Sequence, residues 1–197
     1  MTTPLSPAEE TLRQGFKVFN RFMVLLWRLG WGGMMNAWPD VGGRIMVIVH
    51  TGRKSGKRRL QPLNYAVVDD ALYCLAGFGR VSDWYRNVLA QPHVEVWLPD
   101  GWWAVEAEDV SDSPQRLPLL RQVIIASGFA GRLAGLDARA MPDAEFDRLT
   151  RSYRLLRLRR TLPRTGLGGP GDLAWLWQVT TVLFALLWWR GRGRDGR

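Results

Sequence analysis

The chain of 197 residues, 47% of them hydrophobic, is long enough to bury a core and too apolar for a disordered segment. Its 27 basic and 18 acidic residues give a net charge of +9, which favours nucleic acid, acidic lipid or a phosphorylated ligand as partner. The single cysteine, Cys74, excludes an internal disulfide, and with only two histidines the ligands of a structural zinc site are missing. A reduced, cytoplasmic setting is predicted, and the N-terminus does not read as a signal peptide.

The first expected elements are a helix and three strands. Apolar residues recur every three or four positions from Pro7 to Leu29, which predicts an amphipathic helix. β-Branched residues predict a buried strand over Arg44–Thr51. Two further strands are expected over Leu60–Val68 and Leu72–Gly77, joined by a turn at Asp69-Asp70.

The next elements are a short helix, a hairpin and two longer helices. Ser82-Asp83 can cap a helix over 83–90, which ends before Pro92. Strands are expected over 93–98 and 102–110, on either side of the turn Pro99-Asp100-Gly101. Two helical stretches lie between 113 and 149, and residues 153–160 fit either a helical face or a strand.

The segment GRKSGKRR, residues 52–59, is the main candidate for a binding site. Glycines allow backbone N–H groups to turn toward an anion, and the serine hydroxyl and basic side chains add donors for phosphate or carboxylate. The spacing does not match a phosphate-binding P-loop, and Gly77-Phe78-Gly79 lacks the third glycine of a dinucleotide fingerprint. The alternative is a basic hairpin tip that lies in solvent.

A second candidate is Trp84-Tyr85-Arg86-Asn87 on the short helix. Its alternative interpretation is structural, with Trp84 closing the core and Tyr85 at the rim. Structural or rim positions are also expected for His50 and His93, and burial for Cys74.

The two segments together carry a family resemblance. TGRKSGKRRLQPLNY (51–65), followed by WYRNVLAQP (84–92), resembles the deazaflavin-dependent nitroreductases over residues 44–110, and more loosely as far as Arg160. The resemblance implies an α+β fold: an antiparallel Greek-key split β-barrel, flavin-reductase-like, with flanking helices and an apolar C-terminal helix. Residues 153–160 then become the last strand.

The resemblance also implies coenzyme F420 as cofactor, with FMN as the alternative. Its phosphate and oligoglutamate tail would be held by Arg53, Lys54, Ser55 and Arg59. Pro62 would lie beside the cofactor through its backbone, and Trp84 and Asn87 would help to hold it. Arg80 replaces a basic residue that the family carries before the tryptophan.

The function implied is the reduction of nitro compounds, quinones or other conjugated small molecules. The cofactor carries the hydride, so the protein supplies orientation, electrostatics and water exclusion. No residue is assigned to bond-making chemistry or to a metal; Tyr153 is near the last strand, but a core position is expected for it. The alternative is a non-catalytic split barrel that binds FMN, another cofactor or lipid at the membrane surface. Nucleic acid is not expected, because the basic loop lacks aromatic residues on which bases could stack.

The C-terminal region differs in composition. Residues 166–171 are glycine-rich, and residues 173–189 carry no charge, with tryptophans at both ends and arginines beyond. We expect this segment to contact the inner face of the membrane or, as the alternative, to form a dimer or core helix. The predicted division is an N-terminal helix (1–38), a split barrel that binds the cofactor (39–164), and a linker with the C-terminal helix (165–197).

Overall fold

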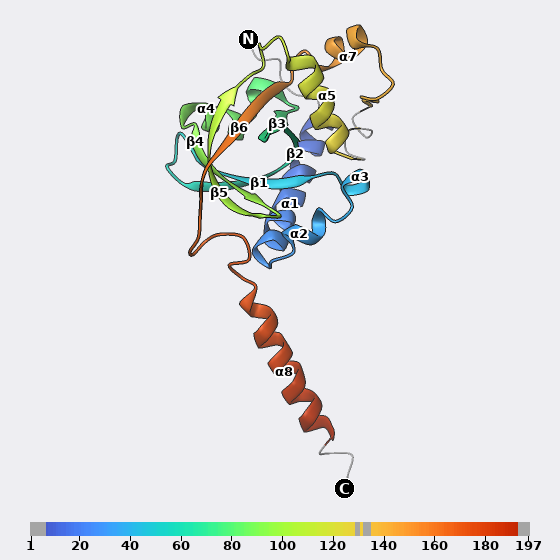
Figure 1. Ribbon diagram of the computed structural model, residues 1–197. Helices are drawn as coiled ribbons and strands as arrows, with labels where there is room; N and C mark the ends of the chain where they lie inside the picture. The colour runs from blue at the N-terminus through green and yellow to red at the C-terminus, as the bar shows by residue number, and fades with distance from the viewer. Residues whose placement is uncertain (1–6, 129–130, 132–134, 193–197) are drawn as a thin grey trace.

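Six antiparallel strands form a closed barrel in the computed structural model, which describes residues 7–128, 131 and 135–192 (Figure 1). The strand order around the barrel is β1-β2-β3-β6-β5-β4, so the last strand inserts between β3 and β5. The predicted antiparallel split barrel is confirmed. The strands are β1 (Ile45–Thr51), β2 (Arg58–Val68), β3 (Ala71–Ala76), β4 (His93–Leu98), β5 (Gly101–Asp109) and β6 (Arg154–Pro163).

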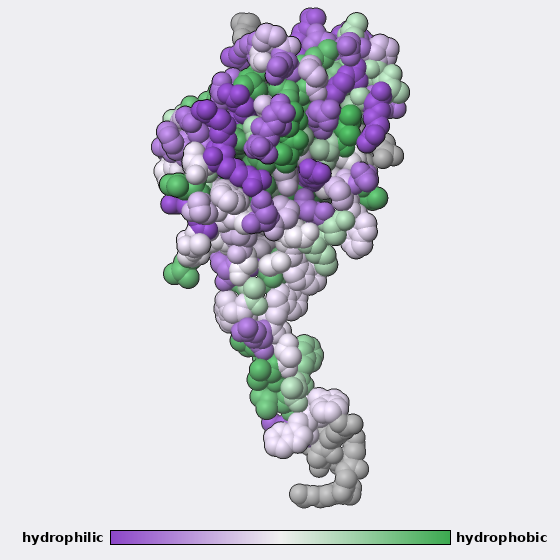
Figure 2. Space-filling model, in the orientation of Figure 1, coloured by the Kyte–Doolittle hydropathy of each residue, from purple (hydrophilic) through white to green (hydrophobic). Residues whose placement is uncertain are grey.

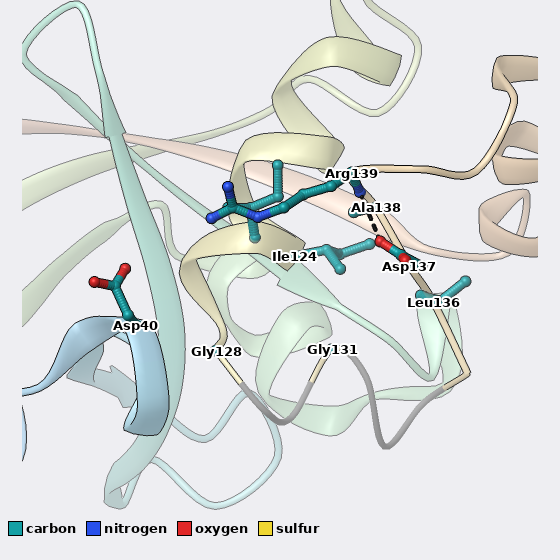
Figure 3. Close-up of a pocket in the computed structure, with 9 residues that line it drawn as sticks. Asp40, Ile124, Gly128, Gly131, Leu136, Asp137, Ala138 and Arg139 are labelled. Carbon is teal, nitrogen blue, oxygen red and sulfur yellow. Dashed lines mark hydrogen bonds between the residues drawn. The ribbon is translucent and has the colours of Figure 1, made fainter.

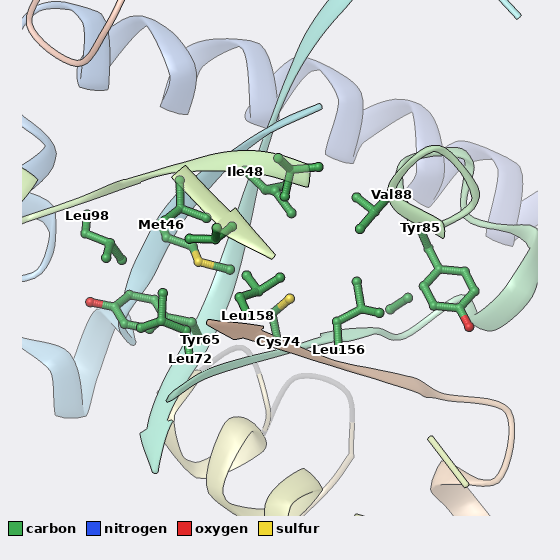
Figure 4. Packing of buried hydrophobic residues seen from close by; sticks show 14 residues of the cluster. Met46, Ile48, Tyr65, Leu72, Cys74, Tyr85, Val88, Leu98, Leu156 and Leu158 are labelled. Atoms are coloured by element: carbon green, nitrogen blue, oxygen red, sulfur yellow. The ribbon is translucent and has the colours of Figure 1, made fainter. Parts of the chain in front are cut away.

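Alternate residues of the strands fill the barrel interior, as the period of two in a strand requires (Figure 4). Met46 and Ile48 of β1 face Leu156 and Leu158 of β6 in this cluster, and Cys74 is fully buried there, as expected. Burial raises the pKa of the Cys74 thiol to about 12. This cysteine is therefore a small core residue and not a reactive thiol.

The turn between β2 and β3 is as short as predicted. Asp69 and Asp70 have φ angles of 47° and 61°, and they connect Val68 to Ala71, the last pair of the β2–β3 ladder. Two positive φ angles give a turn whose twist matches that of the flanking strands, and aspartate tolerates this region better than most residues do.

Helices cover the barrel on two sides (Figure 1). Trp27 of α1 (Pro7–Arg28) is buried against Val47, Val49 and Trp97. The second side is covered by α5 (Arg116–Ala126) and α7 (Asp143–Thr150), which pack against β3 and β6. Two four-residue helices, α2 (Gly32–Met35) and α3 (Pro39–Gly42), lie between α1 and β1.

A short helix, α4 (Asp83–Ala90), follows the 3-10 turn η1 (Gly79–Val81) and packs on the interior cluster through Tyr85 and Val88 (Figure 4). Its N-cap residue is Ser82, at the predicted position, but the Ser82 side chain makes no capping hydrogen bond. One correction concerns Trp84 and Tyr85. Tyr85 is the buried residue and Trp84 the half-buried one, and the Tyr85 hydroxyl donates to Asp109 of β5.

The ambiguous segment 153–160 is a strand, and it extends three residues further, to Pro163. Pairing with β3 from Leu72 to Ala76 and with β5 from Trp103 to Asp109 decides between the two interpretations, since each neighbour would have one unpaired edge without it.

The C-terminal helix α8 (Trp175–Arg192) leads away from the barrel (Figure 1). Its start is attached to the barrel: Trp177 stacks on Trp31 at a centroid distance of 5.4 Å, and its indole Nε1 donates to the Leu29 carbonyl at 3.0 Å. The preceding linker is fixed by a two-pronged ion pair between Arg28 and Asp172. The interpretation of α8 as a helix of the protein's own core is therefore wrong.

Beyond Trp177 the apolar side chains of α8 are exposed, and Figure 2 shows hydrophobic residues gathered along it. Phe184 is 72% exposed and Trp189 75% exposed. Across the residues that the structure describes, no helix combines the length and the apolar character needed to cross a bilayer.

Candidate functional site

The predicted basic loop joins β1 to β2 and is closed by its own backbone. The Gly52 carbonyl accepts hydrogen bonds from the N–H groups of Ser55 at 3.0 Å and Gly56 at 2.8 Å, and Gly56 has a φ of 63°. Gly52 is also required for close packing, because a Cβ there would lie 2.7 Å from Ser55 Oγ and 2.8 Å from Arg59 Nε. The missing side chain therefore leaves a small cradle in which the Ser55 hydroxyl and the Arg59 guanidinium lie side by side.

Arg53 is held from the other side by α4. Its backbone N–H and its guanidinium Nη1 both donate to Asn87 Oδ1, at 3.1 and 2.9 Å. Its Nη2 forms an ion pair with Asp83 Oδ1 at 3.1 Å. Since Asp83 and Asn87 are four residues apart, they lie on one face of α4, and together they fix the first half of the loop.

The other basic residues of the loop differ in their partners. Arg58 forms an ion pair with Glu95 at 3.6 Å and lies over the Trp97 ring. Among the described residues, no ion pair involves Lys54, Lys57 or Arg59, and all three side chains are exposed. These three cations and the Ser55 hydroxyl are the groups through which the loop can bind an anion.

Pro62 is buried in β2, opposite Val47 of β1. β3 pairs with β2 only from Tyr65 to Val68, so the stretch of β2 that contains Pro62 is paired on one side alone. A proline, which lacks an N–H, is tolerated in such a stretch. The Pro62 carbonyl accepts a hydrogen bond from Gln61 Nε2 at 3.1 Å.

Arg80 and Trp84 flank the start of α4. The Arg80 side chain is exposed, while its carbonyl accepts a hydrogen bond from Arg86 Nε at 2.7 Å. Trp84 is half-buried, and its ring packs edge to face with the Tyr85 ring at a centroid distance of 6.3 Å. Hydrogen bonds join Arg53 to Asn87 and Arg59 to Ser55, whereas no hydrogen bond among the described residues joins the side chains of Lys54, Arg80 and Trp84 to these four.

Two residues of this region were missed by the sequence interpretation. Asp83 neutralises Arg53, and its signal in the sequence was its spacing of four from Asn87. His50, the penultimate residue of β1, is 5% exposed, and its Nδ1 lies 3.3 Å from Asn87 Nδ2. His93 is exposed, at the rim, as expected, and Tyr153 is half-buried beside the α5–α7 cluster.

A hollow lies elsewhere on the molecule (Figure 3). It measures about 420 Å³ and is bordered by α3, the end of α5 and the segment 136–139, where Asp137 and Arg139 are linked by a hydrogen bond. None of the predicted binding residues lines it. We therefore place the candidate site at the loop, where the chemistry is, and not at this hollow.

A family model described as F420H(2)-dependent quinone reductase matches residues 30–142. The chain belongs to this family. The match includes the basic loop and α4, and it confirms the resemblance that these two segments carry. As a member of this family of F420-dependent oxidoreductases, the protein uses coenzyme F420, and the cofactor prediction is confirmed.

Solved structures similar to this family member include an F420-H2 dependent reductase with 23% identity, which covers 59% of this chain and 94% of that chain (TM-score 0.41). A conserved hypothetical protein from Mycobacterium tuberculosis has 18% identity, and the match covers 70% of this chain and 89% of that chain (TM-score 0.41). An FMN-binding protein from Nostoc punctiforme, related to pyridoxamine 5′-phosphate oxidase, has 15% identity, and the match covers 79% of this chain and 81% of that chain (TM-score 0.43). No curated protein matches the chain. The family assignment rests on the family model alone.

The residues present fit this cofactor at its anionic part. The Gly52 cradle would be filled by a Cβ, the three unpaired cations are exposed, and the hydroxyl of Ser55 adds a neutral donor. Such a set suits a phosphate and a chain of carboxylates better than an apolar ligand.

Proposed function

We propose that the protein uses reduced F420 to reduce quinones, nitro compounds or other conjugated small molecules. The observation that carries the proposal is the Gly52 cradle. Exposed cations without an ion pair among the described residues surround it, and Asn87 of α4 holds the loop through Arg53. When bound, the cofactor supplies the hydride, and the protein's residues bind and orient it and exclude water.

The roles of the site residues follow from their contacts. Lys54, Ser55 and Arg59 bind the phosphate and carboxylate tail directly, and Lys57 adds charge at the rim. Arg53 already donates to Asn87 and Asp83, so it shapes the loop and contributes its positive charge. The backbone around Pro62, the exposed Arg80 and the half-buried Trp84 border the rest of the cofactor.

The binding role of the loop is tested by fluorescence titration of the purified protein with F420 and, separately, with FMN. We expect micromolar or tighter binding of F420 and weaker binding of FMN. Lys54→Ala and Arg59→Ala should each weaken F420 binding about tenfold, as for the loss of one charge-assisted hydrogen bond. The loss should shrink at high salt, because screening already weakens the wild-type contact.

The matched control is Arg159→Ala on β6, an exposed arginine that forms an ion pair with Glu106 far from the loop in strand order. This variant should bind F420 like the wild type. Equal affinity in all three variants would show that the loop lies in solvent without a binding role. Oxidation of F420H2 in the presence of a benzoquinone or a nitroaromatic compound then identifies the substrate class.

We also propose that α8 contacts the inner face of an anionic membrane. Its exposed apolar residues occur on all sides of the helix, as Val182, Phe184 and Leu187 illustrate, so a single packed face cannot cover them. Tryptophans lie at both ends, and Arg190 follows the uncharged segment. Indole rings favour the headgroup level, and arginine favours an anionic surface.

The test for α8 is flotation with phosphatidylserine-containing vesicles. The full chain should float with the vesicles, and the double variant Phe184→Lys and Leu187→Lys should remain free. Val67→Lys, at a 41% exposed apolar residue on β2, serves as control and should float like the wild type. The alternative, a homodimer through α8, would show as concentration-dependent sedimentation that the double variant abolishes, without vesicle binding.

A further inference from the structure

Asn87 connects the basic loop to the interior of the barrel. Its side chain is on α4 and is buried, at 4% exposure, between Arg53 and His50. The amide oxygen accepts two hydrogen bonds, from the backbone N–H and from Nη1 of Arg53. Both are donors only, so the amide cannot be turned around without placing N–H against N–H. Its NH2 group therefore faces His50 Nδ1, 3.3 Å away.

This arrangement determines the protonation state of His50. Because Asn87 Nδ2 donates, His50 Nδ1 must accept, and an imidazole nitrogen accepts only when it carries no proton. His50 is therefore neutral, with its hydrogen on Nε2. A second proton would turn Nδ1 into a donor that opposes the Asn87 NH2 group.

The surroundings of His50 agree with this state. Burial lowers the pKa of His50, the backbone hydrogen bond at Thr51 opposes this effect, and the charge of Arg59 lowers the pKa further. Arg59 is the residue opposite His50 in the β1–β2 ladder. The other charges nearby are Arg53 and its partner Asp83 on α4. On the interior side of β4, the neighbouring positions are the apolar residues Val94 and Val96.

We propose that neutral His50 is a positioning residue for cofactor binding: as the acceptor for Asn87 Nδ2, it supports the amide whose oxygen holds the backbone and guanidinium of Arg53, and so it helps to preorganise the loop. Protonation of His50 removes the acceptor for Asn87 and releases the loop, and this loss outweighs the attraction of the added positive charge for the cofactor. Affinity for the anionic cofactor therefore falls in acid. This inference rests on the proposed role of the loop in holding F420.

The experiment compares three variants by F420 titration at constant ionic strength between about pH 5.5 and 8, around the ordinary pKa of histidine. His50→Leu, which has no acceptor, should lose about tenfold in affinity at the upper end of this range. His50→Gln can accept from Asn87 through Oε1 without titrating, so it should keep near wild-type affinity at high pH and lose less on acidification. His93→Gln, at the exposed histidine, should follow the wild-type profile.

Protonation of the cofactor phosphate affects all four proteins equally, so the difference between wild type and His50→Gln isolates His50. A wild-type affinity in His50→Leu, or a wild-type pH profile in His50→Gln, would overturn the inference. A ¹⁵N NMR spectrum without cofactor provides an independent measurement: the hydrogen should be on Nε2 of His50, and the Arg53 amide signal should shift in His50→Leu. If F420 does not bind at all while these NMR results hold, the proposed function fails, but the role of His50 in positioning Asn87 and Arg53 stands. A hydrogen on Nδ1 of His50 would refute that role.

Discussion

The β1–β2 loop and α8 both project from the barrel, but they are attached to it in opposite ways. The loop is polar and is held by its own backbone and by Asp83 and Asn87 of α4. α8 is apolar and exposed along its length, and it is held at its start through Trp177 and the linker before it. Exposed groups with fixed positions suit a ligand of defined geometry, whereas an exposed apolar helix without packing suits a fluid or adaptable surface.

The largest expected effect concerns Trp27 of α1, against which the linker before α8 is held. Trp27 is 1% exposed, packs against β1 and β4, and accepts a hydrogen bond from the linker N–H of Gly171 through its carbonyl. Trp27→Ala should lower the free energy of unfolding by about 3–5 kcal/mol, because it leaves a cavity next to the barrel. Chemical denaturation followed by circular dichroism measures this change.

The contrast is Phe184→Ala in α8, which should change the free energy of unfolding in solution by less than about 0.5 kcal/mol. A larger loss in Phe184→Ala would mean that α8 packs against protein, either this chain or a second copy, and the difference between the two regions would disappear.

A smaller effect is expected in the loop, where glycine is needed at two positions for different reasons: the backbone conformation at Gly56 and the close packing at Gly52. Gly56→Ala places a side chain at a φ of 63° and should cost about 1 kcal/mol of stability. Gly52→Ala has no such strain, but its Cβ displaces Ser55 and Arg59. F420 affinity should therefore fall about tenfold in Gly52→Ala. Titration and denaturation of both variants separate the two reasons, and unchanged affinity in Gly52→Ala would argue against the cradle.

The smallest effect concerns the other side of α4. Tyr85 donates to Asp109, whose pKa burial tends to raise; hydrogen bonds from Ser111 and Tyr85 and the charge of Arg154 outweigh burial and hold this pKa below its usual range. A lowered carboxylate pKa stabilises the fold at neutral pH, and this contribution is lost as the pH falls through the folded-state pKa.

Denaturation at a series of pH values from neutral to about pH 3 measures the loss. The free energy of unfolding should fall less steeply in Asp109→Asn than in the wild type, while Asp70→Asn, at an exposed turn residue, should resemble the wild type. Parallel profiles for the wild type and Asp109→Asn would show that Asp109 does not support α4.

Most strands could be predicted because their alternation is local. The segment 153–160 could not be resolved in this way, since leucines between arginines fit a helix and a strand equally, and its partners β3 and β5 lie far away in the sequence. Ser82 satisfied the rule for a cap, yet its side chain makes no such bond, whereas the next residue, Asp83, binds Arg53.

The site was predictable in its residue types and not in its contacts. Arg53 and Lys54 look equivalent in the sequence, but only Arg53 is neutralised by Asp83 and held by Asn87. These contacts span 30 and 34 positions, and no spacing within the loop indicates them. The role inferred for His50 depends on which way an amide points, which only three-dimensional contacts reveal.

The position of β6 in the barrel has a consequence for folding. β6 begins at Arg154 and inserts between β3 and β5, so the strands made first keep two unpaired edges until it is synthesised. Open edges can pair with other chains, and distant pairings close slowly. During synthesis the protein should therefore depend on chaperones, or on the cover that α5 and α7 give to β3, until the segment from Arg154 to Pro163 completes the sheet.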